Sequence, residues 1–341
     1  MLKTITKLQT NGRLYVIIIS DIVIEIDGCK RKGENQMEKV LRDGFIYMSQ
    51  NKTLNSLAKK YGLRFGASRF VAGEDFKTSV PTIRELNAKG LSVTVDHLGE
   101  FITTVAEANE NRDEIIRAIE IMAEEQLDAY MSLKLTSLGF DISDELIEDN
   151  MRQILTTAKE VGVFVAIDME DEARCEKTLD LFKTLKADFD GLGTVIQSYL
   201  YRSEDDINHL APLKPNLRIV KGAYKEPATV AFPEKEDVDH NYLKLVKLHL
   251  ANGNYASIAT HDDHMIDAVI EHVKLNNIPL DQFEFQMLYG IRVERQLELV
   301  RQGYKVRVYV PYGRDWYGYF MRRLAERPAN VAFVLKGMVK K

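Results

Sequence analysis

Short apolar runs recur along the chain after residue 90, and an amphipathic stretch separates most of them from the next. The runs are rich in Val, Ile and Phe, which is typical of buried parallel strands. They predict eight strands, at residues 93–97, 131–135, 163–168, 193–197, 217–221, 256–260, 283–287 and 306–310. Residues 37–90 are more polar and have a helical pattern, so we expect N-terminal helices before the first strand.

The stretch 143–161 shows the helical pattern clearly. Ser143 is a suitable N-cap, Gly162 is a suitable stop, and Ile147, Met151 and Ile154 share one face. Strand alternating with helix eight times predicts an α/β chain folded as a closed (β/α)8 barrel. An open doubly wound sheet is the alternative, but no GxGxxG motif opens any of the helices.

The composition is that of a globular protein. The chain has 341 residues, 45% hydrophobic and 28% charged, and its length suits one barrel or two ordinary domains. Its formal net charge of −5 gives no reason to expect a nucleic-acid partner. Cys29 and Cys175 form no CxxC pair, so neither a disulfide framework nor a zinc site is expected. No apolar run is long enough to span a bilayer and no signal peptide is evident, so we expect a cytoplasmic protein.

Residues 1–36 differ from the rest, because they are β-branched and then basic in "CKRKGENQ". Two explanations remain open. Translation could begin at Met37, since Lys32–Glu34 can be encoded by AAA-GGA-GAA, which contains a bacterial ribosome-binding sequence. Alternatively, the segment is a genuine extra strand or tail. We therefore expect an atypical N-terminal extension over 1–36 and a single domain over 37–341, and intact-mass analysis of native protein distinguishes the two explanations.

Polar side chains lie at or near the ends of the predicted strands. A lysine at the end of a buried strand is costly unless an anion meets it, and barrel enzymes build their active sites at the carboxyl ends of their strands. Any single one of these side chains could instead be a solvated loop edge or a satisfied core group. As a set they predict an active site. In chain order they are Asp96, His97, Lys134, Asp168, Gln197, Arg218, Lys221, Thr260, His261, Gln286 and Tyr309.

The last predicted helix, within 314–330, has two adjacent arginines. Tyr319 lies three and four residues before Arg322 and Arg323, so the three side chains lie close together. Arg322 and Glu326 could form an ordinary surface pair, which is usually weak. The two guanidinium groups could instead form a fork for a carboxylate, whose geometry they match. Spacing alone favours the surface pair.

A set of motifs in fixed order favours the carboxylate fork over the surface pair. They are "SLKLTSLG", "AIDMED", "IQSYL", "RIVKGAYKE", "ATHDDHMI", "FEFQMLYGIR", "VYVPYG" and "YGYFMRRLAE". Together they closely resemble the FAD-dependent proline dehydrogenase family in its monofunctional bacterial form, over about residues 38–335. The resemblance implies a distorted TIM-like barrel with its last helix over the mouth and FAD at the carboxyl ends of the strands. It implies oxidation of L-proline to Δ1-pyrroline-5-carboxylate, the first step of proline catabolism to glutamate, with electrons passing to membrane quinone.

The resemblance also implies roles for individual residues. Lys134, Arg322 and Arg323 would bind the substrate carboxylate, which is the anion that the lysine requires. Asp168 would hold Lys134 and balance its charge. Arg218 would face the flavin and raise its reduction potential, so Asp168 and Arg218 are the expected catalytic residues. The expected FAD contacts are Met169, Gln197, Val220, Lys221, Gly222, Ala223, Tyr224, Thr260 and His261. Within this set the lysine suits the pyrophosphate, and the glycine lets the backbone approach the cofactor.

A gate and a substrate wall follow from the same resemblance. Leu288, Tyr309 and Tyr319 would enclose the pyrroline ring. Glu100 would pair with Arg322 when no substrate is bound and release it as the lid closes. Because the Tyr309 ring leaves little room for a 4-hydroxyl group, we expect proline as the substrate rather than hydroxyproline.

Two other classes of function compete with this one. The segment "HDDH", His261 to His264, could hold a metal in a barrel hydrolase, although Asp262 and Asp263 also suit the start of a helix. We expect no metal. Some larger members of the family also regulate transcription through a DNA-binding segment, but this chain has no basic patch for nucleic acid.

Two partners are expected besides the substrate. Larger members of the family include an aldehyde dehydrogenase domain, for which this chain lacks the length, so a separate pyrroline-5-carboxylate dehydrogenase would take the product. Quinone lies in the lipid phase, so peripheral docking at the inner face of the cell membrane is expected. The C-terminal "LKGMVKK", residues 335–341, could touch an anionic membrane surface or could be a solvated tail.

Overall fold

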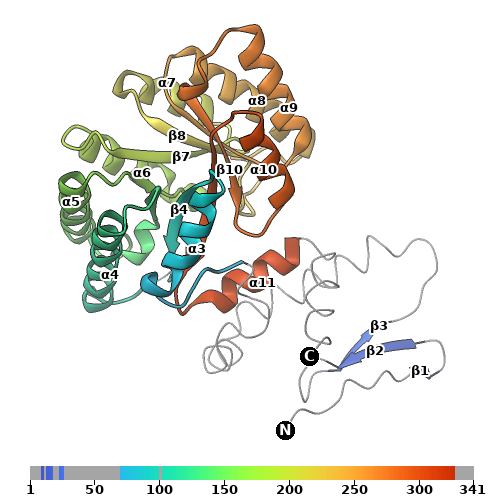
Figure 1. Ribbon diagram of the computed structural model, residues 1–341, viewed down its shortest axis with the longest axis horizontal. Coiled ribbons are helices and arrows are strands. Elements are labelled where there is room, and N and C mark those ends of the chain that lie inside the picture. Colours follow the sequence, from blue (N-terminus) through green and yellow to red (C-terminus); the bar gives the residue numbers. More distant parts are fainter. Residues whose placement is uncertain (1–8, 11–12, 18–22, 27–69, 100–101, 327–341) are drawn as a thin grey trace.

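Eight parallel strands close into a barrel in the computed structural model, which describes residues 9–10, 13–17, 23–26, 70–99 and 102–326. Each strand pairs with the next along the chain, and the last pairs with the first, so the predicted barrel is confirmed (Figure 1). The strands are β4 (Ser92–His97), β5 (Ala129–Leu133), β6 (Val165–Ile167), β7 (Leu192–Gln197), β8 (Asn216–Val220), β9 (Ala256–Ala259), β10 (Phe283–Leu288) and β11 (Val306–Tyr312).

The strand boundaries differ from the expected ones by one or two residues at most of their ends. The run at 163–168 forms only the short strand β6, whereas β11 continues to Tyr312. Arg218, Gln286 and Tyr309 lie inside their strands and not at their ends. Their side chains therefore reach the site from within the barrel wall.

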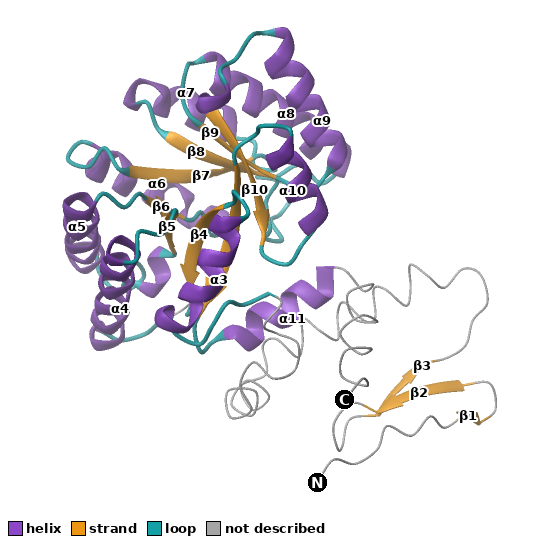
Figure 2. Cartoon of the chain, viewed as in Figure 1, coloured by secondary structure: helices purple, strands orange, loops and turns teal. Residues whose placement is uncertain are grey.

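Helices surround the barrel (Figure 2). The predicted helix at 143–161 is confirmed: Ser143 Oγ accepts a hydrogen bond from the Leu146 N–H at 3.1 Å, and Gly162 ends the helix in the left-handed region at φ 76°. The helices are α3 (Phe76–Ala88), α4 (Val105–Glu124), α5 (Asp144–Val161), α6 (Glu172–Lys186), α7 (Ser203–Leu210), α8 (Lys235–Ala251), α9 (Asp263–Leu275), α10 (Val293–Arg301) and α11 (Trp316–Glu326), with short 3-10 helices at Leu135–Ser137, Ala211–Leu213 and Leu280–Gln282.

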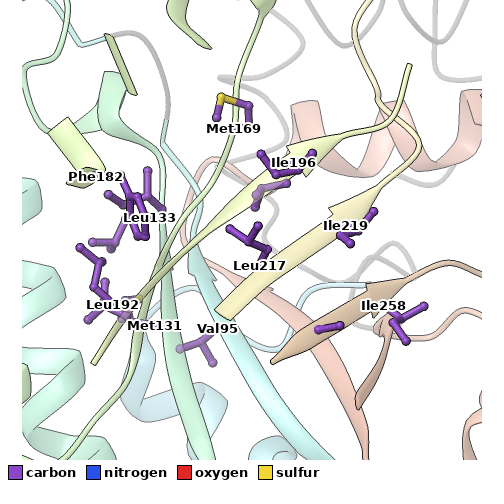
Figure 3. Close-up of a cluster of buried hydrophobic side chains, with 14 of the residues drawn as sticks. Val95, Met131, Leu133, Met169, Phe182, Leu192, Ile196, Leu217, Ile219 and Ile258 are labelled. Carbon is purple, nitrogen blue, oxygen red and sulfur yellow. The ribbon is translucent and has the colours of Figure 1, made fainter. Parts of the chain in front are cut away.

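The apolar core lies between the barrel strands and the helices. Alternate residues of each strand belong to it, as Phe283, Phe285 and Met287 do in β10. The residues between them, Glu284 and Gln286, are equally buried but polar. Because side chains alternate across a strand, the polar set lies on the opposite face, inside the barrel. Figure 3 shows part of the apolar core, with Val95, Met131, Leu133, Met169, Phe182, Leu192, Ile196, Leu217, Ile219 and Ile258 labelled.

The two ends of the chain are described only in part. Residues 9–26 include a three-stranded antiparallel sheet of β1 (Gln9–Thr10), β2 (Arg13–Ile17) and β3 (Val23–Ile26). The expected helices over 37–69, the expected start at Met37 and the tail 335–341 lie outside the described residues, so these predictions and the domain boundary stay predictions. None of the helices in the described part of the chain is long and apolar enough to cross a membrane.

Candidate active site at the carboxyl end of the barrel

Asp168, directly after β6, lies at the centre of the site. Its Oδ1 accepts hydrogen bonds from Arg218 Nη1 (2.8 Å) and Ser132 Oγ (2.6 Å). Its Oδ2 accepts one from the Tyr309 hydroxyl at 2.7 Å. Arg218 and Tyr309 belong to β8 and β11, neither of which neighbours β6 in the barrel. These side chains therefore meet through the barrel interior.

The Asp168 carboxyl is an anion in this environment. Burial by itself raises its pKa, but the positive charges of Arg218 and Lys134 lower it, as do hydrogen bonds from Ser132 and Tyr309. The lowering effects prevail, so the pKa of Asp168 lies below its ordinary value. The site thus contains a fixed negative charge that organises its donors.

Arg218 is a buried cation held by this carboxylate. Only 7% of the residue is exposed, and its Nη2 also donates to Ser132 Oγ at 2.8 Å. The guanidinium carbon lies 5.3 Å from the centre of the Tyr309 ring. Burial opposes its charge, but the Asp168 carboxylate outweighs burial and holds the pKa of Arg218 above its ordinary value. Arg218 therefore stays charged.

Lys134 lies directly after β5 and is paired mainly with Asp96. Its Nζ donates to both carboxylate oxygens of Asp96 at 2.6 Å, whereas Asp168 Oδ2 lies 3.7 Å away. Asp168 thus pairs with Lys134 at the longer distance, and Asp96, whose contact with Lys134 was not predicted, makes the closer one. Burial raises the pKa of Asp96 to about 6, with Lys134 opposing that rise.

A second polar layer lies deeper in the barrel. Arg307 and Tyr130 precede Tyr309 and Ser132 by two residues on their strands, which places them about 7 Å further from the carboxyl end. Arg307 Nε donates to Glu284 at 2.7 Å, and its guanidinium carbon lies 4.0 Å from the centre of the Tyr130 ring. The sequence analysis missed this layer, although polar residues alternate with apolar ones in "FEFQML" and "VRVYV".

Gln197 and Arg218 each have a buried polar atom with no hydrogen-bond partner among the described residues. Gln197 Nε2 donates to the Glu170 and Met169 carbonyls at 3.0 and 3.4 Å, which leaves Oε1 as an acceptor without a donor. Arg218 Nε is a donor without an acceptor. Buried polar groups are nearly always paired, so these two atoms suggest a missing ligand.

The expected FAD-contact residues follow four consecutive strands, β6 to β9, at the same end of the barrel. Thr260 Oγ1 accepts from the Asp262 N–H at 3.1 Å, and His261 Nε2 accepts from the Leu288 N–H at 2.9 Å. Tyr224 is 41% exposed. The set consists of Met169 after β6, Gln197 at the end of β7, Val220 at the end of β8, Lys221, Gly222, Ala223 and Tyr224 after it, and Thr260 and His261 after β9.

The loop after β8 is held by ion pairs of Lys221 and by a close backbone contact at Gly222. Lys221 Nζ lies 2.5 Å from Asp239 and 2.9 Å from Asp262, so two carboxylates already surround the lysine expected at a pyrophosphate. Gly222 has φ +122°, and a Cβ there would lie 2.3 Å from the Tyr199 ring. Contact with Tyr199 therefore requires a glycine here even without a cofactor.

The remaining expected residues are only partly described. Glu100 lies outside the described residues. Arg322 and Arg323 belong to α11, which follows β11 at the carboxyl end of the barrel, but their side chains are outside the described part. Tyr319, on the same helix, is 7% exposed. The position of α11 over the barrel mouth and the Glu100–Arg322 pair stay predictions.

The geometry of the segment His261 to His264 does not support the alternative metal site. Asp262 caps α9 by accepting from the His264 N–H at 3.1 Å, as a helix start predicts. Within the described ranges, no group of three or more His, Cys, Asp or Glu side chains could hold a metal ion.

Known proteins show the family to which the chain belongs. Residues 79–336 match the family model for proline dehydrogenase. The chain is 54% identical over 302 residues to proline dehydrogenase 2 of Bacillus subtilis (strain 168), covering 89% of this chain and 100% of that protein. It is 46% identical over 310 residues to the proline dehydrogenase of Deinococcus radiodurans, covering 89% of this chain and 99% of that protein.

A solved structure shows the same fold. The crystal structure of proline utilization A (PutA) from Bdellovibrio bacteriovorus, inactivated by N-propargylglycine, superposes with a TM-score of 0.75 at 25% identity. The match covers 91% of this chain but only 38% of that longer protein. With a family model that spans most of the barrel and relatives matched over their whole length, the chain belongs to the proline dehydrogenase family.

Proposed function

We propose that the protein is an FAD-dependent dehydrogenase that oxidises L-proline to Δ1-pyrroline-5-carboxylate and passes the electrons to membrane quinone. The observation that supports this most strongly is the buried cluster of Lys134, Asp168, Arg218 and Tyr309. The family motifs single out all four residues, and the barrel brings them together from four different strands.

The residues at the carboxyl end fit a flavin. An isoalloxazine ring presents both an N–H donor and carbonyl acceptors, which match the unpaired Gln197 Oε1 and Arg218 Nε. Bound FAD would accept the hydride that leaves the carbon next to the proline nitrogen. No side chain can act as such a two-electron acceptor. Around it, Met169, Val220, Thr260 and His261 would form the wall. Lys221 already pairs with Asp239 and Asp262, so a pyrophosphate would share the Lys221 ammonium group with these two carboxylates.

Substrate binding would use the cations of the site. Lys134 would donate to the proline carboxylate together with Arg322 and Arg323, whose planar guanidinium groups suit a bidentate contact. Leu288, Tyr319 and the ring of Tyr309 would exclude water from the reacting carbon. Glu100 would hold Arg322 until the substrate displaces it.

Tyr309 would also set the choice of substrate. Its hydroxyl is fixed on Asp168 at 2.7 Å, so the ring cannot easily move away from a larger substrate. We therefore expect Tyr309→Ser to lower kcat/KM for proline by about tenfold and to raise it for 4-hydroxyproline. Steady-state kinetics with both substrates measures this, and an unchanged ratio would contradict the role of Tyr309.

The product would pass to a separate pyrroline-5-carboxylate dehydrogenase. The Bacillus subtilis relative, named as a proline dehydrogenase alone, is matched over its whole length. The Escherichia coli relative, named bifunctional protein PutA, is 28% identical and is matched over only 26% of its length.

Because quinone is a lipid, we place the protein in the cytoplasm with peripheral docking at the inner face of the membrane, and the C-terminal segment 335–341 is the candidate contact.

The test is turnover with a soluble quinone. Purified protein supplied with FAD should reduce the quinone only when L-proline is present, and an aromatic amino-aldehyde should trap one cyclic imine per quinone reduced. Flavin reduction without quinone reduction would show that quinone is not the electron acceptor. Turnover with other amino acids but not with proline would overturn the proposed substrate.

A further inference from the structure

We propose that Asp96 is a positioning residue that holds the ammonium group of Lys134 in the orientation needed to bind the substrate carboxylate. The inference deepens the proposed function and rests on it, because the ligand of Lys134 is taken to be the proline carboxylate. Neither the family motifs nor the comparisons assign a role to Asp96.

The geometry of the contact supports a holding role. Both Asp96 oxygens lie 2.6 Å from Lys134 Nζ, so the carboxylate fixes the lysine side chain symmetrically. Asp96 itself is 2% exposed and lies in β4, paired with Ser132 of β5 and Pro311 of β11. A carboxylate on a strand with partners on both sides is a rigid support.

The backbone of Lys134 is fixed independently. Its carbonyl accepts hydrogen bonds from the Ser137 N–H at 3.1 Å and from Ser137 Oγ at 2.7 Å. Only the flexible side chain therefore remains to be oriented. A lysine side chain has many rotamers in solution, so a fixed partner lowers the entropic cost of orienting it toward a ligand.

Asp168 cannot replace Asp96 in this role. Its two oxygens already accept three hydrogen bonds, from Arg218, Ser132 and Tyr309, at 2.6–2.8 Å. Without the Asp96 charge, Lys134 would turn toward Asp168, which is now 3.7 Å away, and compete with Tyr309 for its Oδ2. The ammonium group would then be drawn away from the substrate carboxylate.

The charge of Asp96 gives the arrangement a pH dependence. The charged or titratable groups that face Asp96 are Lys134 after β5, Asp168 after β6, and Tyr309 and Tyr312 in β11, with His97 next to it on β4. Burial raises the pKa of Asp96 to about 6, so the carboxylate is charged above that pH and neutral below it. We expect KM for proline to rise as the pH falls through about 6, because Asp96 then releases Lys134.

A double-mutant cycle tests the proposal. Asp96→Asn should raise KM for proline about tenfold at neutral pH and change kcat by less than about threefold. In a Lys134→Met background, the added Asp96→Asn should have no further effect on KM, because there is no ammonium group left to orient. A merely structural role of Asp96 would make the two substitutions additive.

Asp206→Asn is the matched control. Asp206 is also a buried carboxylate, 8% exposed, and Arg202 Nε and Nη2 donate to its oxygens at 2.9 and 3.1 Å, but it lies in α7 outside the barrel. This variant should leave KM for proline unchanged. Equal KM changes in Asp96→Asn and Asp206→Asn, or a further KM change in the Lys134→Met background, would overturn the proposal.

The wild-type protein supplies a test that needs no variant to fold. Its KM for proline, measured across pH 6, should rise on the acid side, and a flat KM would overturn the role of Asp96. If wild-type protein with FAD does not oxidise proline at all, the proposed function fails. If it does and the cycle is additive, only the role of Asp96 fails.

Discussion

At the scale of single residues, the site depends on charges that are buried and paired. Arg218 and Asp168 hold each other, and Asp96 holds Lys134. The types of residue and their order along the chain were predictable from the motifs. The pairing was not, because it depends on which side chains meet across the barrel, and the sequence alone does not give the relative heights of the strands.

Arg218 is the residue whose charge should act most directly on the flavin. As a buried cation it should favour the electron-rich reduced state, so Arg218→Met should lower the flavin reduction potential and decrease kcat about 100-fold. Spectroelectrochemistry measures the potential. The control Arg152→Met removes a 37% exposed arginine side chain on α5 and should change neither quantity. A potential that is the same in Arg218→Met and wild type would contradict the flavin-facing position.

His249 should make the fold sensitive to acid independently of catalysis. It is fully buried in α8, its Nε2 lies 3.0 Å from the Tyr255 carbonyl oxygen, and burial lowers its pKa to about 4. Since this folded-state pKa is below the ordinary value of about 6.5, the neutral ring stabilises the fold above pH 6.5 and that stability is lost as the pH falls toward 4.

The expected loss from His249 is about 2 kcal/mol of unfolding free energy between about pH 7.5 and about pH 5. Urea unfolding at the two pH values measures it, in wild type and in His249→Gln. The carboxyl groups titrate in both proteins, so the difference between them isolates His249. The same pH dependence in both would show that His249 does not contribute.

At the scale of elements, strand positions and helix caps follow from local sequence. Ser143 and Gly162 bound α5 as expected, because a cap needs only its own residues. The reason for Gly222 was not predictable in this way. Its positive φ and its approach to the Tyr199 ring depend on how the loop after β8 packs on the segment after β7.

Gly222→Ala should disturb the loop after β8 and the cofactor residues on it. A Cβ would lie 2.3 Å from the Tyr199 ring, so the loop must shift, and we expect about tenfold weaker FAD binding. Gly253→Ala is the control, since Gly253 also has a positive φ, +73°, but no heavy atom within 4 Å of its Cβ position. FAD titration of the apoprotein measures both, and equal affinities would count against this loop as a cofactor contact.

At the scale of the whole molecule, the barrel has an apolar outer layer and a polar interior. The strands pack Val, Ile and Phe against the helices, while Glu284, Arg307, Tyr130 and Gln286 fill the interior below the site. The fold class was predictable because strand and helix alternate. The polar filling was not predicted, because the composition of a short strand does not show which of its faces lines the barrel interior.

The buried ion pair between Glu284 and Arg307 should contribute more to the free energy of unfolding than an exposed pair does. Glu284→Gln leaves Arg307, which is 5% exposed, without its anion and should lower the unfolding free energy by about 3–5 kcal/mol. Glu85→Gln breaks the exposed pair between Glu85 of α3 and Lys89, and should change the unfolding free energy far less. Denaturant unfolding compares the two, and similar losses would mean that the interior pair adds little.

The most direct test of the central claim is an anaerobic titration with L-proline, followed by the visible spectrum of the FAD-loaded protein. The account predicts that the oxidised flavin band disappears as about one proline is added per flavin, because each substrate molecule transfers one hydride. A protein that takes up no FAD, or a bound flavin that proline leaves oxidised, would contradict it.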